Sequence, residues 1–345
     1  MNTPQASEKT VTPLTKKDFM SDQEVRWCPG CGDYSILAQT QRVMPDLGIP
    51  KHKTVFVSGI GCSSRFPYYM NTYGFHTIHG RATAVATGVK VANPKLDVWV
   101  ISGDGDALSI GGNHFIHALR RNIGFKLLVL NNEIYGLTKG QYSPTTKQGS
   151  VTKSSPYGAV DRTFSPAALG LGANATFYAR AVDTNPKLLT EVILAAAQHR
   201  GTSFVEILQN CVIFNDKCHH AITSKETRAD NQLLLQHGKP MLFGANNNKG
   251  IILRGTELIV GTLGERGITE KDILIHDAHA ESPNLAFMLS QLNLPHAPVP
   301  LGIIRQISAP TYEDSVCEQI ARVKASKGVG DFDKLLHSGD TWEVG

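Results

Sequence analysis

The chain has 345 residues, of which 41% are hydrophobic and 19% are charged, a balance typical of a soluble globular protein with one large domain or two. The net charge of +4 is small, and the chain has neither a Lys/Arg block nor an alternation of basic and aromatic residues, which argues against nucleic-acid binding. The chain has no run of about twenty apolar residues that would predict a membrane span, and its N-terminus lacks the apolar core of a secretion signal. We therefore expect a cytoplasmic protein that is not bound to a membrane.

The first segment of the chain, residues 1–24, is polar and predicts an arm that is flexible unless it docks on a partner. It is followed by the motif Trp27-Cys28-Pro29-Gly30-Cys31, in which Pro and Gly hold two cysteines in a tight loop. A chain this large does not need disulfides, and in a reducing compartment a Cys-x-x-Cys pair is more often a metal or redox site. A helix is expected over residues 35–43.

The next elements are a buried strand and a helix. The strand is expected over 54–58, and Gly59-Ile60-Gly61-Cys62 follows at its carboxyl end. His79-Gly80-Arg81 opens a helix that is rich in Ala and Val and ends at Asn93-Pro94. The small residues of this helix predict close packing against a sheet.

The central part of the chain reads as a strand–helix–strand unit, the building block of a parallel sheet. A strand over 97–102 leads into a Gly103–Gly105 turn and a helix expected over 109–122. A second buried strand over 126–130 ends at Asn131-Asn132.

The two strand ends of this unit carry oxygen ligands. Asp104 and Asn132 each follow a strand, so their side chains should meet at one sheet edge, where the backbone carbonyl of Ile134 is well placed to join them. Such a set suits Mg²⁺, which prefers oxygen ligands and leaves positions for phosphate. Gly105 and Gly136 let backbone N–H groups approach an anion closely. The site therefore suits Mg²⁺ plus a diphosphate, and GDG followed by NN at this spacing resembles the diphosphate signature of thiamine diphosphate enzymes.

The alternation of strands and helices continues to about residue 225. After a long loop over 139–163, a type often functional in compact domains, a helix is expected over 165–171 and a strand over 176–182. A helix over 187–200 has Asn185 as its N-cap and Gly201 just past its end, and a strand over 203–208 precedes Cys211.

Beyond residue 225 the alternation weakens. Asn246–Gly250 reads as a turn between short β-like runs, and a helix is expected over about 312–324. We therefore expect a C-terminal extension rather than more sheet.

The cysteines are expected at the same sheet edge as the diphosphate site, because ligands of open parallel sheets bind outside the carboxyl ends of the strands. The fold should bring Cys62 and Cys211 there, and the loop of Cys28 and Cys31 can reach it. Four thiolates suggest a Cys₄ zinc site or a [4Fe–4S] cluster, and we favour the cluster because zinc sites usually pair two Cys-x-x-Cys motifs.

Two cysteines remain outside this set. Cys218, followed by His219-His220, is an alternative fourth ligand or part of a small zinc site. Cys317 is expected in a helix, with its side chain in the protein core.

Taken together, the motifs WCPGCGD, GIGCSS, HGRA, GDGD, GGNH, NNEIYGLTKGQ and ILQNC resemble the β subunit of 2-oxoacid:ferredoxin oxidoreductases, with the 2-oxoglutarate branch nearest. The match runs from about Val25 to Phe214. The resemblance implies a doubly wound α/β fold with a mostly parallel sheet of the thiamine diphosphate-binding (pyrophosphate-domain) type. We expect an arm over 1–24, this domain over 25–225 and an extension over 226–345.

The resemblance also implies which residues hold each group. The cluster would be held by Cys28, Cys31, Cys62 and Cys211, and Mg²⁺ by Asp104, Asn132 and the backbone of Ile134. Thiamine diphosphate contacts are expected from Ile60, Gly61, Cys62, Ser63, Gly105, Asp106, Gly136, Leu137 and Thr138. His79 and Arg81 form a second expected contact region, and both are also candidate catalytic residues. Lys139 is expected to attract a carboxylate of the substrate.

The implied reaction is the reversible, coenzyme A-dependent oxidative decarboxylation of 2-oxoglutarate to succinyl-CoA and CO₂, with electrons passed through the cluster to ferredoxin. A separate α subunit is expected to complete the cofactor site, in an α2β2 complex, so this chain alone should be inactive. The alternatives are the same chemistry on pyruvate or other 2-oxoacids, a thiamine diphosphate enzyme without redox chemistry, and a zinc-bearing binding subunit.

Overall fold

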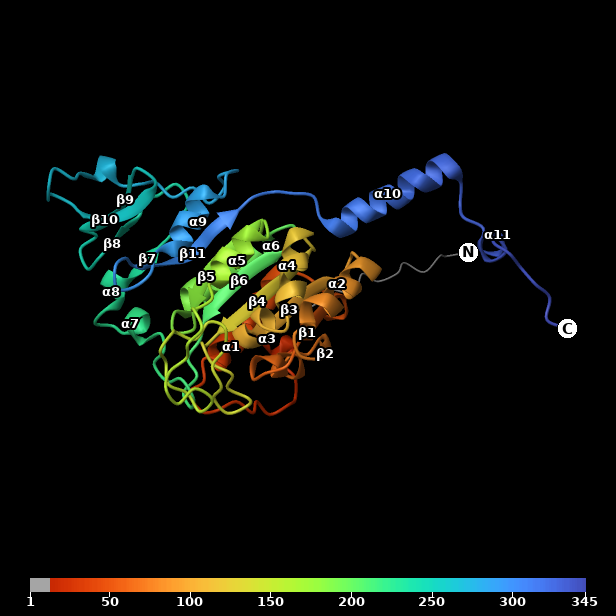
Figure 1. Ribbon diagram of the computed structural model, residues 1–345, viewed down its shortest axis with the longest axis horizontal. Coiled ribbons are helices and arrows are strands. Elements are labelled where there is room, and N and C mark those ends of the chain that lie inside the picture. The colour runs from red at the N-terminus through yellow and green to blue at the C-terminus, as the bar shows by residue number, and fades with distance from the viewer. Residues whose placement is uncertain (1–12) are drawn as a thin grey trace, which may run out of the picture.

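The computed structural model describes residues 13–345 and is built around an eight-stranded sheet (Figure 1). The strand order is β2–β1–β3–β4–β6–β5–β11–β7. The strands span Thr54–Ser58 (β1), Tyr73–His76 (β2), Asp97–Gly103 (β3), Phe125–Asn131 (β4), Phe177–Val182 (β5), Ser203–Leu208 (β6), Gln232–Leu234 (β7) and Val299–Gln306 (β11). The first six strands in this order are mutually parallel, β11 runs antiparallel to β5, and β7 runs parallel to β11.

Helices cover both faces of this sheet, as Figure 1 shows. One face packs against α1 (Asp33–Val43) and α6 (Pro186–Gln198). The other packs against α2 (Ala82–Ala92), α4 (Gly112–Arg120), α5 (Pro166–Gly172) and α9 (Asn284–Gln291). Alternate residues of β3 divide between the two layers: Val98 and Val100 join one core, and Trp99 and Ile101 join the other. The doubly wound, mostly parallel α/β fold is therefore confirmed.

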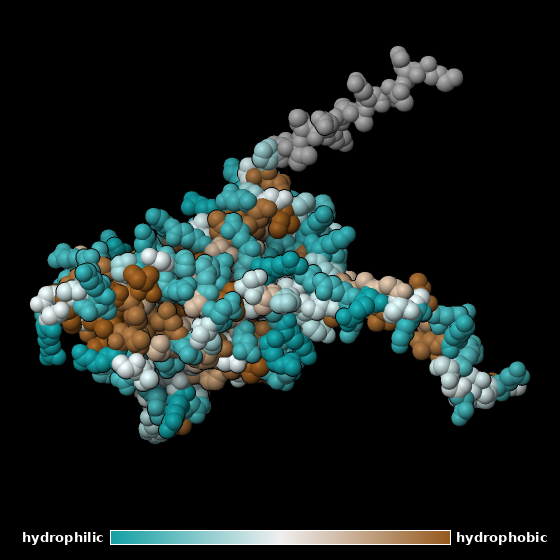
Figure 2. Space-filling model, turned by 90° about the horizontal axis from the view of Figure 1, so that it is seen from above, coloured by the Kyte–Doolittle hydropathy of each residue, from teal (hydrophilic) through white to brown (hydrophobic). Residues whose placement is uncertain are grey.

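Smaller elements complete the molecule. A second sheet contains β8 (Leu242–Phe243), β9 (Lys249–Arg254) and β10 (Glu257–Thr262), and short helices span Asp104–Leu108 (α3), His220–Thr223 (α7) and Arg228–Asn231 (α8). At the C-terminal end, α10 (Tyr312–Lys327) and α11 (Phe332–Leu336) form an arm that projects from the body (Figures 1 and 2). Short 3₁₀ helices span Lys16–Phe19, Met44–Leu47, Lys51–Lys53, Ser63–Tyr69 and Glu270–Asp272.

Most of the expected elements are present. The strands expected at 54–58 and 203–208 coincide with β1 and β6. The cap predicted for α6 is confirmed, because the Asn185 side chain accepts a hydrogen bond from the Leu188 backbone N–H at 3.2 Å.

The expectation that the chain after residue 225 adds nothing to the sheet is wrong. β7 and β11 both join its edge, beside β5. Pro300, Gly302 and a register shift between Ile303 and Arg305 interrupt β11, so its sequence lacks the regular alternation of a strand.

The helix expected over 109–122 is interrupted. Its residues form only α4, and α3 precedes it, with a break at residues 109–111. A Cβ on Gly111 would lie 2.4 Å from the carbonyl oxygen of Asp106 and 3.1 Å from the Cα of Gly80. The break therefore lets the loop that carries His79 and Gly80 pack against the end of α3.

Two further expectations need correction. Residues 13–24 do not form a free arm, because Phe19 is fully buried in the core and Met20 pairs with Met70; residues 1–12 lie outside the described part of the chain. Cys317 lies in α10, as expected for a helix, but it is exposed on the projecting arm rather than buried.

Candidate functional site

The carboxyl ends of four parallel strands meet at one edge of the sheet. The ladder pairs Ser58 of β1 with Ile101 of β3, Gly103 of β3 with Leu130 of β4, and Asn131 of β4 with Leu208 of β6. A cavity of about 90 Å³ opens at this edge. Its walls include most of the expected cofactor contacts: Ile60, Gly61, Cys62, Ser63, His79, Asp104, Gly105, Asp106, Asn132, Ile134, Gly136, Leu137 and Thr138.

Asp104 lines this cavity and is 1% exposed. One of its carboxylate oxygens, Oδ2, accepts hydrogen bonds from Ser143 Oγ and Thr145 Oγ1, each at 2.6 Å. Burial raises the pKa of Asp104, and the two hydroxyl donors oppose this shift. The second oxygen is thus the one available to a cation.

The second expected metal ligand, Asn132, lies across the same cavity. Its Oδ1 accepts a hydrogen bond from the Ile134 backbone N–H at 3.1 Å, and its Nδ2 donates to Gln209 Oε1 at 2.9 Å. These two bonds fix the amide so that its oxygen lies on the side of Ile134. Carboxylate and amide oxygens therefore flank one space, as an oxygen-seeking cation requires.

Glycine is required beside Asp104. A Cβ on Gly105 would lie 2.2 Å from Cε1 of the Tyr135 ring, and the Tyr135 hydroxyl donates to the Gly105 carbonyl oxygen at 3.0 Å. The ring therefore covers the backbone of Gly105 closely. Nearby, the hydroxyl of Ser63 is buried and has no hydrogen-bond partner within residues 13–345, and Ser63 lines the cavity. A buried hydroxyl left without a partner fits a ligand with acceptor oxygens, such as a diphosphate.

Asp106 lines the cavity and also connects two of its loops. Its Oδ1 accepts hydrogen bonds from the backbone N–H groups of Gly80 at 2.7 Å and Ile60 at 3.2 Å, and it lies 2.6 Å from His79 Nδ1. Its Oδ2 accepts from Ser102 Oγ at 2.5 Å. The carboxylate thus ties the loop after β1 to the loop before α2 and orients the His79 ring toward the cavity.

The four expected cluster cysteines lie on loops that surround the neighbouring part of this edge. A Cβ on Gly136 would lie 3.5 Å from Cys211 Sγ and 3.6 Å from Cys62 Sγ, so this glycine borders both sulfurs. Cys31 Sγ accepts a hydrogen bond from Gln209 Nε2 at 3.3 Å, next to the strand end that leads to Cys211. Cys28 lies one turn before Cys31 and is exposed.

The electrostatics of the thiols follow from this arrangement. Burial raises the pKa of Cys62 to about 12 and that of Cys31 still further, with the Asp33 carboxylate and neighbouring thiols adding to both shifts. Thiols that are hard to ionise alone need a bound cation to become thiolate ligands. Among residues 13–345, no group of three or more His, Cys, Asp or Glu side chains is close enough to hold a metal ion as it stands. The loops bring the four cysteines into one region without forming a finished site.

Two expected residues are not at the cavity wall. Lys139 is exposed and has a left-handed backbone (φ +77°), and Arg81 Nη1 donates to the Ile110 carbonyl oxygen at 3.3 Å, beside α2. Cys218 lies apart as well, because its thiol faces the Gln209 carbonyl oxygen at 3.8 Å and the residue lines a second cavity.

The sequence analysis missed several residues of the site. Ser143 and Thr145 come from the long loop over 139–163, and only the loop's length pointed to function. Asp33 lines the cavity, is 2% exposed, and has a pKa raised to about 7 by burial and by Asp183. Tyr135 and Gln209 complete the set, and their positions inside the motifs NNEIYG and ILQNC were the only available signal.

Comparison with known proteins supports the same interpretation. Residues 59–207 match the model of the thiamine pyrophosphate enzyme C-terminal TPP-binding domain. The chain is 54% identical over 340 residues to "2-oxoglutarate oxidoreductase subunit KorB" of Mycobacterium tuberculosis, which covers 97% of this chain and 90% of that protein. It is 49% identical over 185 residues to "2-oxoglutarate synthase subunit KorB" of Archaeoglobus fulgidus, covering 54% of this chain and 69% of the relative.

A solved structure extends this likeness to the fold. The 2-oxoglutarate:ferredoxin oxidoreductase from Magnetococcus marinus, determined with 2-oxoglutarate, coenzyme A and succinyl-CoA bound, matches with a TM-score of 0.76 and 33% identity, covering 96% of this chain and 98% of that one. Sequence likeness over nearly the whole chain, the matching fold and the thiamine pyrophosphate domain agree, and the chain belongs to the β subunits of the 2-oxoacid:ferredoxin oxidoreductases.

Proposed function

We propose that this chain is the thiamine diphosphate-binding subunit of a 2-oxoglutarate:ferredoxin oxidoreductase. The reaction is the reversible, coenzyme A-dependent oxidative decarboxylation of 2-oxoglutarate to succinyl-CoA and CO₂, with electrons passed to ferredoxin. The observation that carries the proposal is the meeting of Asp104, Asn132 and Cys62 around one cavity at the strand ends, with the Cys211 sulfur beside Gly136 of the cavity wall. The full-length relative named for 2-oxoglutarate supports the choice of substrate.

In this proposal Asp104, Asn132 and the Ile134 carbonyl group would hold Mg²⁺, whose charge would offset that of the diphosphate. The Ser143 and Thr145 hydroxyls fix the Asp104 carboxylate. The Ser63 hydroxyl and the backbone around Gly105 and Gly136, which line the cavity, would bind the diphosphate. When bound, thiamine diphosphate supplies the electron sink on which a 2-oxoacid loses CO₂. The chain's own contribution is to bind and orient the cofactor.

The [4Fe–4S] cluster is proposed on Cys28, Cys31, Cys62 and Cys211. Gln209 connects the two sites, since its Nε2 donates to Cys31 Sγ and its Oε1 accepts from Asn132 Nδ2. The Gln209 side chain therefore links Asn132, a proposed Mg²⁺ ligand, to Cys31, a proposed cluster ligand. This link supports the proposal that electrons pass from the cofactor to the cluster over a short path. Hydrogen bonds to cluster sulfurs also tune the reduction potential.

Other subunits are needed for a complete site. The cavity of about 90 Å³ is well below the volume of about 300 Å³ at which ligand pockets usually begin, which supports a half-site completed by a separate α subunit. Exposed apolar side chains on the arm of α10 and α11, including Phe332, Leu335 and Leu336, offer further surface for partner subunits (Figure 2). We propose an α2β2 complex with ferredoxin as electron acceptor.

The substrate contacts and the domain division are also proposals. Lys139 is exposed beside the loop that carries Leu137 and Thr138, from where its charge can reach a substrate carboxylate at the subunit boundary. His79, held by Asp106, faces the same cavity, and Arg81 follows it. Residues 25–225 form the cofactor-binding unit and 226–345 the extension, although β7 and β11 of the extension complete the sheet.

The proposal is tested by anaerobic co-purification of the chain with its partner subunits, followed by iron, sulfide and thiamine diphosphate analysis. We expect iron and sulfide in equal amounts, bound thiamine diphosphate, and a broad absorption at about 400 nm. A folded complex that contains zinc without iron, or neither iron nor thiamine diphosphate, would refute it. Profiling of 2-oxoglutarate against pyruvate and branched-chain 2-oxoacids then decides the substrate, since one relative in Aeropyrum pernix is named only for 2-oxoacids.

Within residues 13–345, none of the helices combines the length and the apolar character needed to cross a membrane.

A further inference from the structure

A second and larger cavity lies on the other side of the Asn131 strand end. Its volume is about 610 Å³, and none of the residues that line it also lines the cofactor cavity. Side chains from β5, β6, the long loop and the end of α9 enclose it, among them Arg180, Glu206, Lys147 and Leu294. A cavity of this size is in the range of small-molecule sites, which begin at about 300 Å³.

One wall of this cavity carries a buried guanidinium group. Arg180 is 7% exposed, and its Nε donates to Glu206 Oε2 at 2.9 Å. Within residues 13–345, its two terminal nitrogens make no hydrogen bond of normal geometry, although the Tyr178 ring lies beside the group at 5.9 Å. Buried guanidinium nitrogens ordinarily have partners, so this edge is open to a ligand.

Glu206 does not compete for that edge. Its Oε1 accepts from Asn131 Nδ2 at 2.8 Å, and its Oε2 accepts from the Tyr178 hydroxyl at 2.7 Å in addition to Arg180. Both oxygens are therefore satisfied by groups of the protein itself. The ion pair holds the guanidinium in place and leaves its outer edge available.

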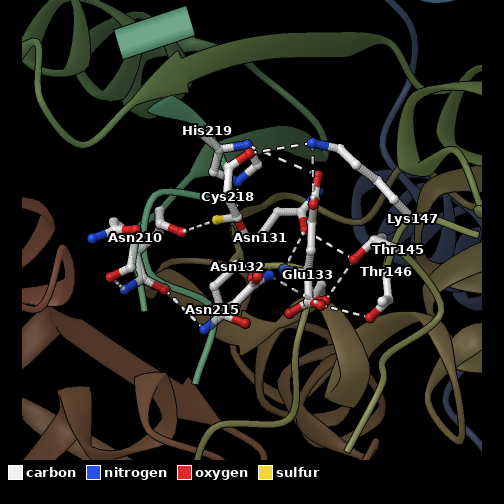
Figure 3. A network of polar contacts seen from close by, with 12 residues as sticks. Asn131, Asn132, Glu133, Thr145, Thr146, Lys147, Asn210, Asn215, Cys218 and His219 are labelled. Atoms are coloured by element: carbon white, nitrogen blue, oxygen red, sulfur yellow. Dashed lines mark hydrogen bonds and ion pairs between the residues drawn. The ribbon is translucent and has the colours of Figure 1, made fainter. Parts of the chain in front are cut away.

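A second cation, Lys147, lines the same cavity (Figure 3). Lys147 Nζ donates to the Cys218 carbonyl oxygen at 3.2 Å and lies 3.6 Å from Glu133 Oε2, and its side chain is 60% exposed. Glu133 also faces His219, whose Nδ1 lies 3.9 Å from its Oε1. Lys147 and Arg180 each have a carboxyl neighbour, Glu133 and Glu206 respectively. What distinguishes the Arg180 end is therefore the geometry of the guanidinium, whose Nε alone is bonded to Glu206.

We propose that this cavity binds a small organic carboxylate, with its two oxygens against the terminal nitrogens of Arg180 and its carbon chain against the apolar wall. The planar edge of a guanidinium matches the two oxygens of a carboxylate in a bidentate pair. Phe164, Leu294, Pro295 and Val299 supply the apolar surface that a carbon chain requires. Inorganic phosphate fits less well, because a dianion would meet one paired Arg and the nearby Glu133 and Glu206 carboxyl groups.

The test is equilibrium binding to the complete complex loaded with thiamine diphosphate, with hexanoate, succinate and inorganic phosphate as probes in separate titrations. We expect saturable binding of at least one carboxylate, with one site per chain, and binding of phosphate at least tenfold weaker. Absence of saturable carboxylate binding would overturn the proposal, as would phosphate binding of equal strength.

Two variants locate the site. Arg180→Lys keeps the charge beside Glu206 but removes the planar edge, and Ala221→Trp places bulk at an exposed position that lines this cavity and not the cofactor cavity. Each should weaken carboxylate binding at least tenfold while thiamine diphosphate content is unchanged. Lys153→Met, on the same loop as Lys147 but outside the cavity, is the matched control and should bind normally. Unchanged binding in Ala221→Trp would overturn the proposal even where Arg180→Lys does not fold.

Discussion

The hydroxyl of Thr145 donates a hydrogen bond to the buried carboxylate of Asp104 at 2.6 Å, although the two residues lie 41 positions apart in the chain. The same hydroxyl lies 3.0 Å from Asn131 Oδ1, at the end of the next strand. The long loop after the second diphosphate motif therefore folds back onto the first. Through this contact, the loop and the two strand ends form a single preorganised site.

Removing this hydroxyl should weaken cofactor retention. In Thr145→Val the Asp104 carboxylate loses one of its two hydroxyl donors, and a hydrogen bond to a charged group contributes about 1.5 kcal/mol, so thiamine diphosphate should bind roughly tenfold more weakly. The measurement is a titration of cofactor-depleted complex with thiamine diphosphate at saturating Mg²⁺. Ser154→Ala, an exposed hydroxyl in the same loop, is the control, and equal affinities in the two variants would contradict the role of Thr145.

Asp104→Asn should have a larger effect than the loop variants. The side chain keeps its shape, but the only carboxylate in the proposed Mg²⁺ site is lost, so the complex should purify without thiamine diphosphate and without activity. The change also removes a buried carboxyl group whose pKa is raised, so folding should not suffer. Cofactor content and the unfolding temperature separate these effects, and a fully loaded Asp104→Asn complex would remove Asp104 from the metal site.

The close packing at Gly105 yields a paired prediction. Gly105→Ala places a Cβ about 2.2 Å from the Tyr135 ring, so the ring must move and the backbone beside the diphosphate moves with it. We expect weaker thiamine diphosphate binding, with partial recovery in the double variant Gly105→Ala, Tyr135→Ala. Gly112→Ala in α4 is the control, because no atom lies within 4 Å of its added Cβ. If Gly105→Ala binds thiamine diphosphate with unchanged affinity, Tyr135 does not fix the backbone of Gly105.

Much of this site follows from sequence because its residues stand directly after strands. Asp104, Asn132 and Cys62 are placed by the register of a parallel sheet, so a short apolar run before each was sufficient to predict their meeting. Ser143 and Thr145 reach Asp104 through a loop, and Asp33 reaches the cavity from a helix start, and both paths depend on tertiary packing. The addition of β11 to the sheet was hidden for a related reason, since Pro300 and Gly302 are unfavourable in a strand and only its neighbours β5 and β7 stabilise it there.

The cysteine assignments are separated by single substitutions. Cys62→Ser and Cys211→Ser should each abolish the absorption at about 400 nm and the bound iron, because a [4Fe–4S] cluster needs its thiolate ligands. Cys218→Ser and Cys317→Ser should retain both, since Cys218 faces a different cavity and Cys317 lies on the exposed arm. Iron content and absorption of anaerobically purified complexes give the result. If Cys218→Ser loses its iron and Cys211→Ser retains it, then Cys218 and not Cys211 is the fourth cluster ligand.

The stability of the chain should fall in mild acid because of a partly buried histidine. His199 follows α6, and its Nε2 lies 2.9 Å from the Thr176 hydroxyl. Burial, together with the positive charge of Lys126, lowers the pKa of His199 from 6.5 to about 4. The folded state therefore holds this ring neutral, whereas the unfolded chain binds a proton below about pH 6.5.

The contribution of His199 to stability is fully present above pH 6.5 and is lost as the pH falls from 6.5 toward 4, where the folded ring also becomes protonated. His199→Gln removes the titration and keeps a hydrogen-bonding side chain, so the variant should lose less stability than the wild type in this window. Because the ring is partly exposed and water screens its charge, we expect a difference of roughly 1 kcal/mol between pH 7 and pH 4.5. Urea unfolding at both pH values measures it, with His52→Gln, at an exposed position, as the control. Parallel pH dependence in wild type and His199→Gln would show that the acid sensitivity arises at other groups.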